Sequence, residues 1–350
     1  MMKKIPTIRD VAQRSNYSLS TVSLVLNNKP NVSETARREV RTIIDELGYH
    51  PRRNARGLAS HHSGNIGFIV TDDHFSRAEP FYTKIFLGTE FEARKHNYYI
   101  LLTTVSRSFR TSEIPRFLLE HNADGVIVAG EIGNGWIEYM MEQRLPVVLI
   151  DYALSRRPVS AVLIDNEAGA RLAVDHLYNN GHTRIGFIAG NMSHPSIRSR
   201  YEGYCETMMR HGLLVRRDLV CTDAETTAQA DGYRAAQRLF TVPAPPTAVF
   251  AANDAMAIGC MQFMKEHGVT VGEQTAVIGF DNIEAGLHVA PRLSTIGVPC
   301  EELGSNAVRR MAEMIRDKTS VVTTTVVPVE LIVRESCGSN RQAASVGALS

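Results

Sequence analysis

Thr7 to Asn27 reads TIRDVAQRSNYSLSTVSLVLN, and this stretch decides the fold of the N-terminal part of the chain. Thr7 is a suitable cap for a first helix, and Asp10 lies in its first turn, where the helix dipole favours an acidic side chain. The apolar positions of this helix are Ile8, Val11 and Ala12. Ser18 is a suitable cap for a second helix, whose apolar positions are Val22, Val25 and Leu26. The stretch therefore predicts two short helices joined by a tight polar turn.

The second predicted helix presents mostly small and polar side chains on its outward face. These residues are Leu19, Ser20, Thr21, Ser23, Leu24 and Asn27. Such a face suits a helix that lies in the major groove of DNA. An ordinary helical hairpin fits the same pattern, so the segments that follow have to decide between the two interpretations.

A third helix is predicted to begin after Ser33 and to end at Gly48, a residue type that is common at helix C-termini. Its apolar stripe consists of Val40, Ile43, Ile44 and Leu47. The segment RRNARGLASHHSG then follows Pro51. A plain linker is one interpretation of this segment. Its arginines around a single large apolar residue favour instead a short helix in a minor groove, where Arg56 contacts phosphates and Leu58 acts as a wedge between base steps.

The composition is that of an ordinary globular protein with an uneven charge. The chain has 350 residues, enough for two or three domains with large cores. Residues 1–62 carry 11 Lys and Arg against 5 Asp and Glu, whereas the remainder carries 27 against 32, so the head is expected to bind a polyanion. The 5 cysteines form no CxxC pair, and neither a signal peptide nor a long apolar run is visible. We therefore expect a cytoplasmic protein without a thiolate metal site.

From Asn65 onward, short apolar runs alternate with amphipathic segments. The expected strands are 66–70, 98–103, 125–130, 146–151, 161–165, 185–190, 219–223, 248–254 and 276–282. The expected helices are 81–97, 114–122, 166–181, 200–212, 229–240 and 254–268. This alternation is typical of doubly wound α/β domains with parallel sheets.

An internal repeat indicates two such lobes. The segment at 66–69 matches that at 185–188, and the segment at 125–129 matches that at 248–252. In the same order, 146–151 matches 276–281, at a nearly constant separation. Ligands of such sheets bind beyond the carboxyl ends of the strands, so we expect the site in the cleft between the lobes. The polar residues at those ends are Thr71, Asp72, Asp73, Glu131, Asp151, Asn191, Asn253, Asp254, Asp281 and Asn282.

The residue types of the predicted cleft favour a binding protein over an enzyme. The sequence contains no Walker phosphate loop, GxGxxG after the first strand, HExxH or GxSxG motif, so no cofactor is expected. Arg200 is expected either to grip a hydroxyl pair or a carboxylate, or to be a surface arginine. Asp281 has the alternative interpretation of a loop cap, and a helix cap is the favoured interpretation of Asp165. Residues 133–135 are expected to form a loop.

Two parts of the sequence together resemble a known family. TIRDVAQRSNYSLSTVSLVLNN, followed by VSETARREVRTIIDELGYHPRRNARGLAS, resembles the DNA-binding head of the lactose and galactose repressor (LacI/GalR) family. AVFAANDAMAIG, VIGFDN and RLSTIGVP resemble its effector-binding core. The resemblance implies an all-α helix-turn-helix head and a core of two lobes like that of periplasmic binding proteins. It also implies a dimeric or tetrameric repressor, with a homodimer as the default, that binds a palindromic operator under the control of a small molecule.

The resemblance and the residue patterns together assign residues to both sites. The expected DNA contacts are Thr7, Ser18, Leu19, Ser20, Thr21, Ser23, Leu24, Asn27, Ser33, Tyr49, Ala55, Arg56 and Leu58. The expected effector contacts are Phe81, Tyr82, Asp165, Arg200, Asn253 and Asp281. Leu24 departs from the family, since many members carry a base-reading Arg or His there. No aromatic residue stands near Thr226 and Thr227, where many members stack one on the ligand.

The expected division of the chain is a head at 1–50, a hinge at 51–62, a core at 63–335 and a disordered tail at 336–350. Within the core, the first lobe is expected to comprise about 63–165 and 294–320, and the second about 166–293 and 321–335. A sugar or sugar derivative is the expected effector, and a nucleobase or other metabolite acting as corepressor is the alternative. A free-standing solute-binding protein is a further alternative, although such a protein would have no use for a DNA-binding head such as residues 1–60.

Overall fold

The structure, a computed structural model, describes residues 6–26, 29–49, 62–72, 80–154, 158–190 and 192–338. The chain forms two compact units, Met1–Gly64 and Asn65–Ser350, which we call the head and the core. Several residues singled out above lie outside the described residues: Asn27, Ala55, Arg56, Leu58, Asp73 and Asn191. In the described ranges, no helix is both long enough and apolar enough to cross a membrane.

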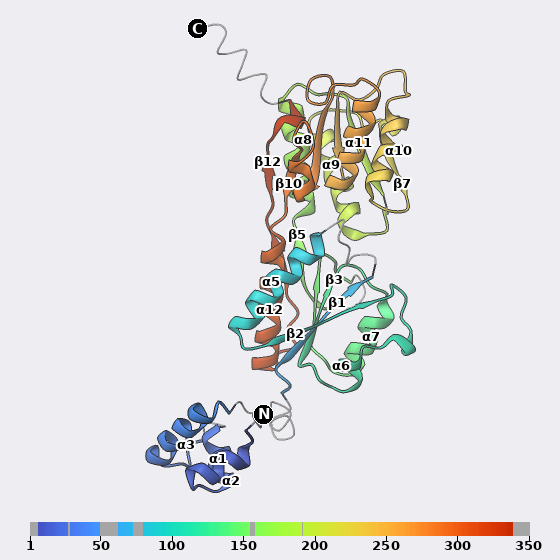
Figure 1. Ribbon diagram of the computed structural model, residues 1–350. Helices are drawn as coiled ribbons and strands as arrows, with labels where there is room; N and C mark the ends of the chain where they lie inside the picture. Colours follow the sequence, from blue (N-terminus) through green and yellow to red (C-terminus); the bar gives the residue numbers. More distant parts are fainter. Residues whose placement is uncertain are drawn as a thin grey trace, which may run out of the picture. The chain divides into compact units, whose positions relative to one another are not determined.

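The head contains the three predicted helices, α1 (Ile8–Ser15), α2 (Leu19–Leu26) and α3 (Glu34–Leu47), drawn in blue in Figure 1. Thr7 and Asp10 form a reciprocal capping box at α1, in which the Thr7 N–H donates to the Asp10 carboxylate at 2.7 Å. Ser33 caps α3, and Gly48 ends it in the left-handed conformation with a φ of 60°. The helices close around a small apolar core: Val11, Ala12, Val22, Val25, Val40 and Tyr49.

The core contains two six-stranded sheets. The first has the order β11-β5-β4-β3-β1-β2 and is parallel throughout. Its strands are β1 (Asn65–Thr71), β2 (Tyr99–Val105), β3 (Gly125–Ala129), β4 (Val147–Ile150), β5 (Ser160–Ile164) and β11 (Thr324–Val327). The second has the order β12-β10-β9-β8-β6-β7, and only β12 runs antiparallel. Its strands are β6 (Ile185–Gly190), β7 (Val220–Ala224), β8 (Ala248–Ala251), β9 (Ala276–Asp281), β10 (Ser294–Gly297) and β12 (Glu330–Ile332).

Helices pack on both sheets and define the two lobes. The helices of the first lobe are α5 (Phe81–Lys95), α6 (Arg116–Leu119), α7 (Asn134–Glu142) and α12 (Cys300–Asp317). Those of the second lobe are α8 (Asn166–Asn179), α9 (Pro195–Arg210), α10 (Gln229–Leu239) and α11 (Asp254–Glu266). Short 3-10 turns occur at Thr111–Glu113, Arg217–Leu219, Glu284–Leu287 and Glu335–Cys337. Packed pairs of helices, α5 with α12, α8 with α9 and α10 with α11, cover the sheets (Figure 1). The predicted doubly wound lobes are confirmed.

The expected boundaries of the lobes are wrong at two strands. β10 pairs in parallel with β9, so residues 294–297 belong to the second lobe. β11 pairs in parallel with β5, so residues 324–327 belong to the first. The chain consequently crosses between the lobes three times within residues 158–338: from β5 to α8, from β10 to α12 and from β11 to β12.

Two smaller expectations are also wrong. Residues 133–135 do not form a loop: Gly133 is the N-cap of α7, because the buried face of Trp136, Ile137 and Met140 holds this segment as a helix. The expected tail does not begin at Ser336. The Ser336 hydroxyl is buried, donates to the Val277 carbonyl at 2.6 Å and accepts from the Ser294 N–H at 2.8 Å, which ties residues 336–338 to the second sheet.

Candidate functional site

The head residues expected to contact DNA lie mostly on the open face of α2 and beside its N-terminus. Thr7, Ser18, Leu19, Ser20 and Ser33 are exposed, and Thr21, Ser23 and Leu24 are half-buried. Leu19 is 47% exposed, which is unusual for a large apolar side chain and leaves it available for an apolar contact. Tyr49 differs, because it is buried in the core of the head.

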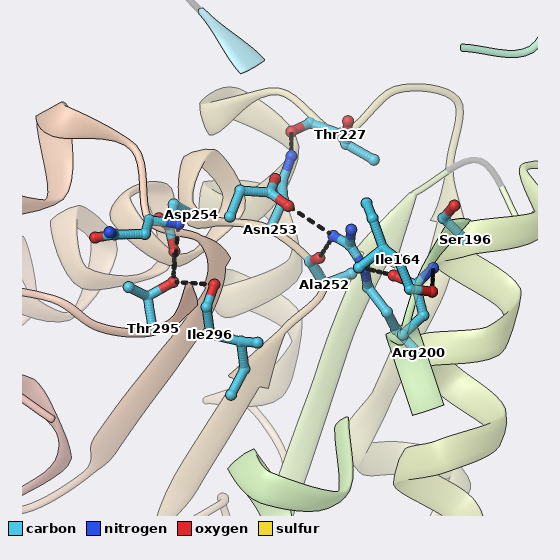
Figure 2. Close-up of polar contacts among 12 residues, drawn as sticks. Ile164, Ser196, Arg200, Thr227, Ala252, Asn253, Asp254, Thr295 and Ile296 are labelled. Carbon is cyan, nitrogen blue, oxygen red and sulfur yellow. Dashed lines mark hydrogen bonds and ion pairs between the residues drawn. The ribbon is translucent and has the colours of Figure 1, made fainter. Parts of the chain in front are cut away.

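Arg200 is the centre of a polar cluster at the carboxyl end of the second sheet. It is 3% exposed, so it is not a surface arginine. Its Nε donates to Asn166 Oδ1 at 2.8 Å, and its Nη1 donates to the Ala252 carbonyl at 2.6 Å (Figure 2). Nη1 also lies 3.2 Å from Asp281 Oδ1, and the guanidinium carbon lies 3.6 Å from the centroid of the Phe280 ring. Nη2 makes no hydrogen bond to a described residue, so a fixed cation keeps one donor group for a ligand.

Two other expected contacts are helix caps at the ends of strands. Asn253 Oδ1 accepts from the Met256 N–H at 2.9 Å, and its Nδ2 donates to the Thr227 carbonyl at 3.0 Å (Figure 2). Asp165 Oδ1 accepts from the Ala168 N–H at 3.1 Å, which agrees with the interpretation of this residue as a cap. Both side chains therefore position the start of a helix that faces the cleft.

The first lobe contributes Asp151 and two aromatic residues. The Tyr82 hydroxyl donates to Asp151 Oδ2 at 2.9 Å, and Phe81 packs edge-on against Tyr82 with 5.1 Å between ring centroids. Ser196, on α9 of the second lobe, donates from Oγ to Asp151 Oδ1 at 2.7 Å and to the Asp151 carbonyl at 2.9 Å. Asp151 is therefore hydrogen-bonded to both lobes.

The pKa of Tyr82 depends on charged groups of both lobes. Burial raises the pKa of Tyr82 well above its ordinary value, and Asp151 raises it further. Asp281 also raises the pKa, whereas Arg200 lowers it. Charged groups of both lobes therefore lie near enough to Tyr82 to affect its pKa.

A buried carboxyl group stands next to this cluster. Asp254 Oδ1 accepts from the Thr295 hydroxyl at 2.6 Å, and Oδ2 accepts from the Ile283 N–H at 2.8 Å. The Thr295 hydroxyl also lies 3.4 Å from the Ile296 carbonyl (Figure 2). Burial and the nearby Asp281 raise the pKa of Asp254 from 3.8 to about 8, so it is protonated at neutral pH.

The expected effector residues Tyr82, Arg200 and Asp281 are brought together. Asp151 was expected only as a polar residue at a strand end, and Asn166 and Ser196 were not expected at the site. The sequence held a signal for Asp151, because it occupies the position in the first repeat that Asp281 occupies in the second. Both residues have a positive φ, 70° at Asp151 and 104° at Asp281. This conformation is strained for residues other than glycine and is concentrated at functional sites.

The cluster is equipped for hydrogen bonding. It offers guanidinium and hydroxyl donors and carboxylate acceptors, the set that a polyhydroxylated ligand needs. Among the described residues, no group of three or more His, Cys, Asp or Glu side chains is placed to hold a metal ion.

Comparison with known proteins agrees with this arrangement. The model described as "Bacterial regulatory proteins, lacI family" matches residues 7–52, and that described as "Periplasmic binding protein-like domain" matches residues 174–337. The transcriptional repressor CytR of Escherichia coli K12 is 32% identical over 333 residues, 94% of this chain and 96% of its own length. Catabolite control protein A of Priestia megaterium is 30% identical over 333 residues, 94% of this chain and 98% of its own length.

Solved structures resemble the whole chain as well. The lac repressor dimer bound to operator and the anti-inducer ONPF has a TM-score of 0.80 at 27% identity, covering 95% of this chain and 99% of its own. The complex of the regulator CelR with cellobiose has a TM-score of 0.72 at 29% identity, covering 95% and 99%. With a matching head, a matching core and relatives at this identity over nearly the whole length, the chain belongs to the lacI family of bacterial regulatory proteins.

Proposed function

We propose that the protein is a transcriptional repressor that binds a palindromic operator as a homodimer and responds to a sugar or sugar derivative bound between its lobes. The observation that carries the effector part is the buried Arg200. Four groups around it, Asn166, Ala252, Phe280 and Asp281, fix its orientation without occupying all its donors.

The DNA-binding part rests on the exposed face of α2. Its small hydroxyl side chains suit contacts to phosphates and base edges, and Leu19 and Leu24 suit the methyl groups of thymine. The basic charge of residues 1–62 supports binding to the phosphate backbone. The lac repressor dimer, which resembles this chain, was solved bound to its operator, and we infer the same mode of binding here.

Effector binding is coupled to DNA binding through the arrangement of the lobes. A ligand that contacts Arg200 on one lobe and the Tyr82–Asp151 pair on the other has different affinities for different lobe arrangements. Such a difference is what shifts an equilibrium, and typical couplings are about 1–3 kcal/mol. The relatives CytR and PurR are transcriptional repressors, and we propose that the cluster binds its ligand without chemical change.

A matched substitution tests the effector site. Asp281→Asn keeps the size of the side chain and removes the charge that pairs with Arg200. We expect this variant to bind operator normally and to lose at least about tenfold in effector affinity, since a charge-assisted hydrogen bond contributes about 1.5–3 kcal/mol. Glu302→Gln, an exposed carboxylate on α12, is the control.

The measurement combines two assays on the full-length protein. A thermal-shift screen of neutral sugars, sugar acids and nucleobases identifies the effector class, and fluorescence anisotropy measures binding to DNA selected from a random pool. A nucleobase that shifts the melting temperature when sugars do not would support the corepressor alternative. An unchanged effector response in Asp281→Asn would show that the ligand binds elsewhere.

A further inference from the structure

We propose that Arg334 is a positioning residue of the effector site, which holds Asp281 in place through the side chain of Asn282. This inference rests on the proposed function, because Asp281 pairs with Arg200, the proposed ligand-binding cation. Arg334 follows β12 near the C-terminal end of the described core, and it was not among the expected effector contacts. Its effect on a ligand is therefore exerted through other residues.

The turn after β9 has a backbone conformation that residues other than glycine rarely adopt. Asp281, the last residue of β9, has a φ of 104°, and Asn282 has a φ of 55°. Two such residues in succession are energetically costly, and they persist only where the surrounding structure holds them. The Asp281 carboxylate, 3.2 Å from Arg200 Nη1, therefore keeps its position only while other groups hold this turn.

Arg334 connects this turn to the segment that leads into β10. Its Nη2 donates to Asn282 Oδ1 at 2.7 Å, and its Nη1 donates to the Leu293 carbonyl at 2.6 Å. The Arg334 N–H also donates to Ser294 Oγ at 2.9 Å, which fixes the backbone of the arginine on the second sheet. Both guanidinium bonds are charge-assisted, a class roughly twice as strong as hydrogen bonds between neutral groups. The guanidinium is thus anchored at one end and holds Asn282 with the other.

Two other contacts hold the turn through its backbone. The Asn282 N–H donates to Thr295 Oγ1 at 3.4 Å, which is long for a hydrogen bond. The Ile283 N–H donates to Asp254 Oδ2 at 2.8 Å, but burial raises the pKa of Asp254 to about 8, so this acceptor is uncharged at neutral pH. Neither contact involves the side chain of Asn282. The bond from Arg334 is therefore the charge-assisted contact by which Asn282 is held.

A second arginine in the same region provides a matched control. Arg292 donates from Nε to Glu335 Oε1 at 2.8 Å, and its side chain is 60% exposed. This ion pair fixes the same C-terminal segment as Arg334, without a contact to the turn. Loss of Arg292 therefore reports what a weakened C-terminal segment does by itself.

Isothermal titration calorimetry on the full-length protein measures the effect on ligand affinity. The probes are glucose, ribose, glucuronate, cellobiose, cytidine and hypoxanthine, and the probe that binds the wild type most tightly is used for all variants. Arg334→Met should weaken its binding at least about tenfold, because the released turn no longer holds Asp281 beside Arg200. Arg334→Lys, which keeps the charge but not the forked pair of donors, should give an intermediate loss. Arg292→Met should bind within about twofold of the wild type.

A double-mutant cycle separates positioning from a general loss of structure. Glycine adopts a positive φ without strain, so Asn282→Gly keeps the turn while it removes the acceptor of the Arg334 bond. In the Asn282→Gly background, Arg334→Met should change the affinity by less than about twofold, because the two residues act through one contact. A general structural defect would weaken binding by the same factor in both backgrounds. If Arg334→Met does not fold, the cycle is run with Arg334→Lys.

Hydrogen exchange of the unliganded full-length protein tests the turn without a ligand. In Arg334→Met, the amides of Asn282 and Ile283 should exchange at least about tenfold faster than in the wild type, because local opening of the turn becomes easier. In Arg292→Met, the exchange of the same two amides should be unchanged.

A non-additive loss of affinity together with faster exchange at the turn supports the role of Arg334. Additive losses, an equal loss in Arg292→Met, or unchanged exchange at the turn overturns it. If Asp281→Asn loses the ligand while Arg334→Met binds it as the wild type does, the proposed function stands and only the positioning role fails. If Asp281→Asn binds normally, or no probe binds the wild type, the effector site fails, and the exchange result decides whether Arg334 holds the turn.

Discussion

At the scale of single residues, two aspartates at equivalent positions of the repeat interact with different partners. Asp281 pairs with Arg200 inside the second lobe, whereas Asp151 accepts from Tyr82 of its own lobe and from Ser196 of the other. Their positive φ values aim both carboxylates into the cleft from the ends of β9 and β4. The shared backbone conformation thus supplies one acceptor that pairs with Arg200, the proposed ligand-binding cation, and one that joins the lobes.

Asp254 makes stability depend on pH. Folded Asp254 binds a proton below about pH 8, whereas an unfolded aspartate binds one only below about pH 4. The native state therefore binds more protons than the unfolded state between these pH values. The contribution of Asp254 to the free energy of unfolding is fully present below about pH 4 and is lost as the pH rises through about 8. A difference of one in pKa corresponds to about 1.4 kcal/mol, so the total effect is on the order of a few kcal/mol.

Asp254→Asn should remove this dependence, because the amide mimics the protonated acid. Its Nδ2 can donate to Thr295 Oγ1, whose proton then points to the Ile296 carbonyl, and its Oδ1 can accept from the Ile283 N–H. Urea unfolding of the wild type and the variant, followed between about pH 5 and about pH 8, measures the effect. If the free energy of unfolding changed with pH in the same way in both proteins, the raised pKa of Asp254 would be contradicted.

Leu24 defines a second prediction at this scale. The side chain is half-buried on the candidate reading helix α2, where it offers apolar surface and no hydrogen bonds. Leu24→Arg introduces a donor pair suited to guanine, and such a contact contributes about 1–3 kcal/mol of base discrimination. We expect a binding-site selection to return a changed operator preference at one position of each half-site, and an unchanged consensus would count against contact of residue 24 with bases.

At the scale of elements, glycines allow the closest helix contact of the first lobe. A Cβ on Gly88 of α5 would stand 2.0 Å from the Glu301 carbonyl oxygen of α12, and one on Gly304 of α12 would stand 2.2 Å from the Ile85 carbonyl oxygen. Glu92 of α5, buried at this crossing, accepts from Arg309 of α12 at 3.0 Å, and Lys95 and Arg309 hold its pKa below the ordinary value. Because α5 begins with Phe81 and Tyr82, this crossing also positions the cleft.

Gly304→Ala should therefore destabilise the protein although alanine favours helices. Overpacking against backbone costs about 1–3 kcal/mol or more, and the gain in helix propensity of about 1 kcal/mol offsets only part of it. We expect a net loss of about 1–2 kcal/mol in urea unfolding, together with weaker effector binding as α5 shifts. Glu302→Ala, exposed on the same helix, should stay within about 0.5 kcal/mol of wild type; a loss of similar size there would exclude the crossing as the cause.

The elements that the sequence predicted well are those with strong local signals. The caps Thr7, Ser33 and Asn253 and the apolar strands of the repeat were readable because periodicity and capping act over a few residues. The strands β10, β11 and β12 are only three or four residues long, and which sheet each one joins is decided by its pairing with strands distant in the sequence. The burial of Arg200 could not be predicted from the sequence either. It depends on hydrogen bonds from Arg200 to Asn166 and to the Ala252 carbonyl, and only the tertiary fold brings these groups within 2.8 Å of the guanidinium.

At the scale of the whole molecule, the head and the core are separate compact units, each with its own apolar core. The cleft residues all lie within the core, and the candidate reading helix lies within the head. Coupling between the two sites is therefore expected to require the intact chain.

A fragment of residues 65–350 should therefore bind the effector with wild-type affinity and lose sequence-specific DNA binding. Calorimetry with the effector and anisotropy with the selected operator measure the two properties, with the full-length protein as the reference. Specific operator binding by the fragment would remove the head from the proposed function. Lost effector binding would show that the head contributes to the cleft.

The three crossings between the lobes also bear on how the chain is made. Because α12 and β11 belong to the first lobe, that lobe stays incomplete until residue 327 has left the ribosome, and the second lobe waits for β12 at residues 330–332. The apolar core of the head lies within the first fifty or so residues, and N-terminal units generally fold first during synthesis. During synthesis the head would therefore fold well before either lobe is complete. A nascent repressor could then bind DNA before it can bind an effector, and effector control would become possible only when translation is nearly finished.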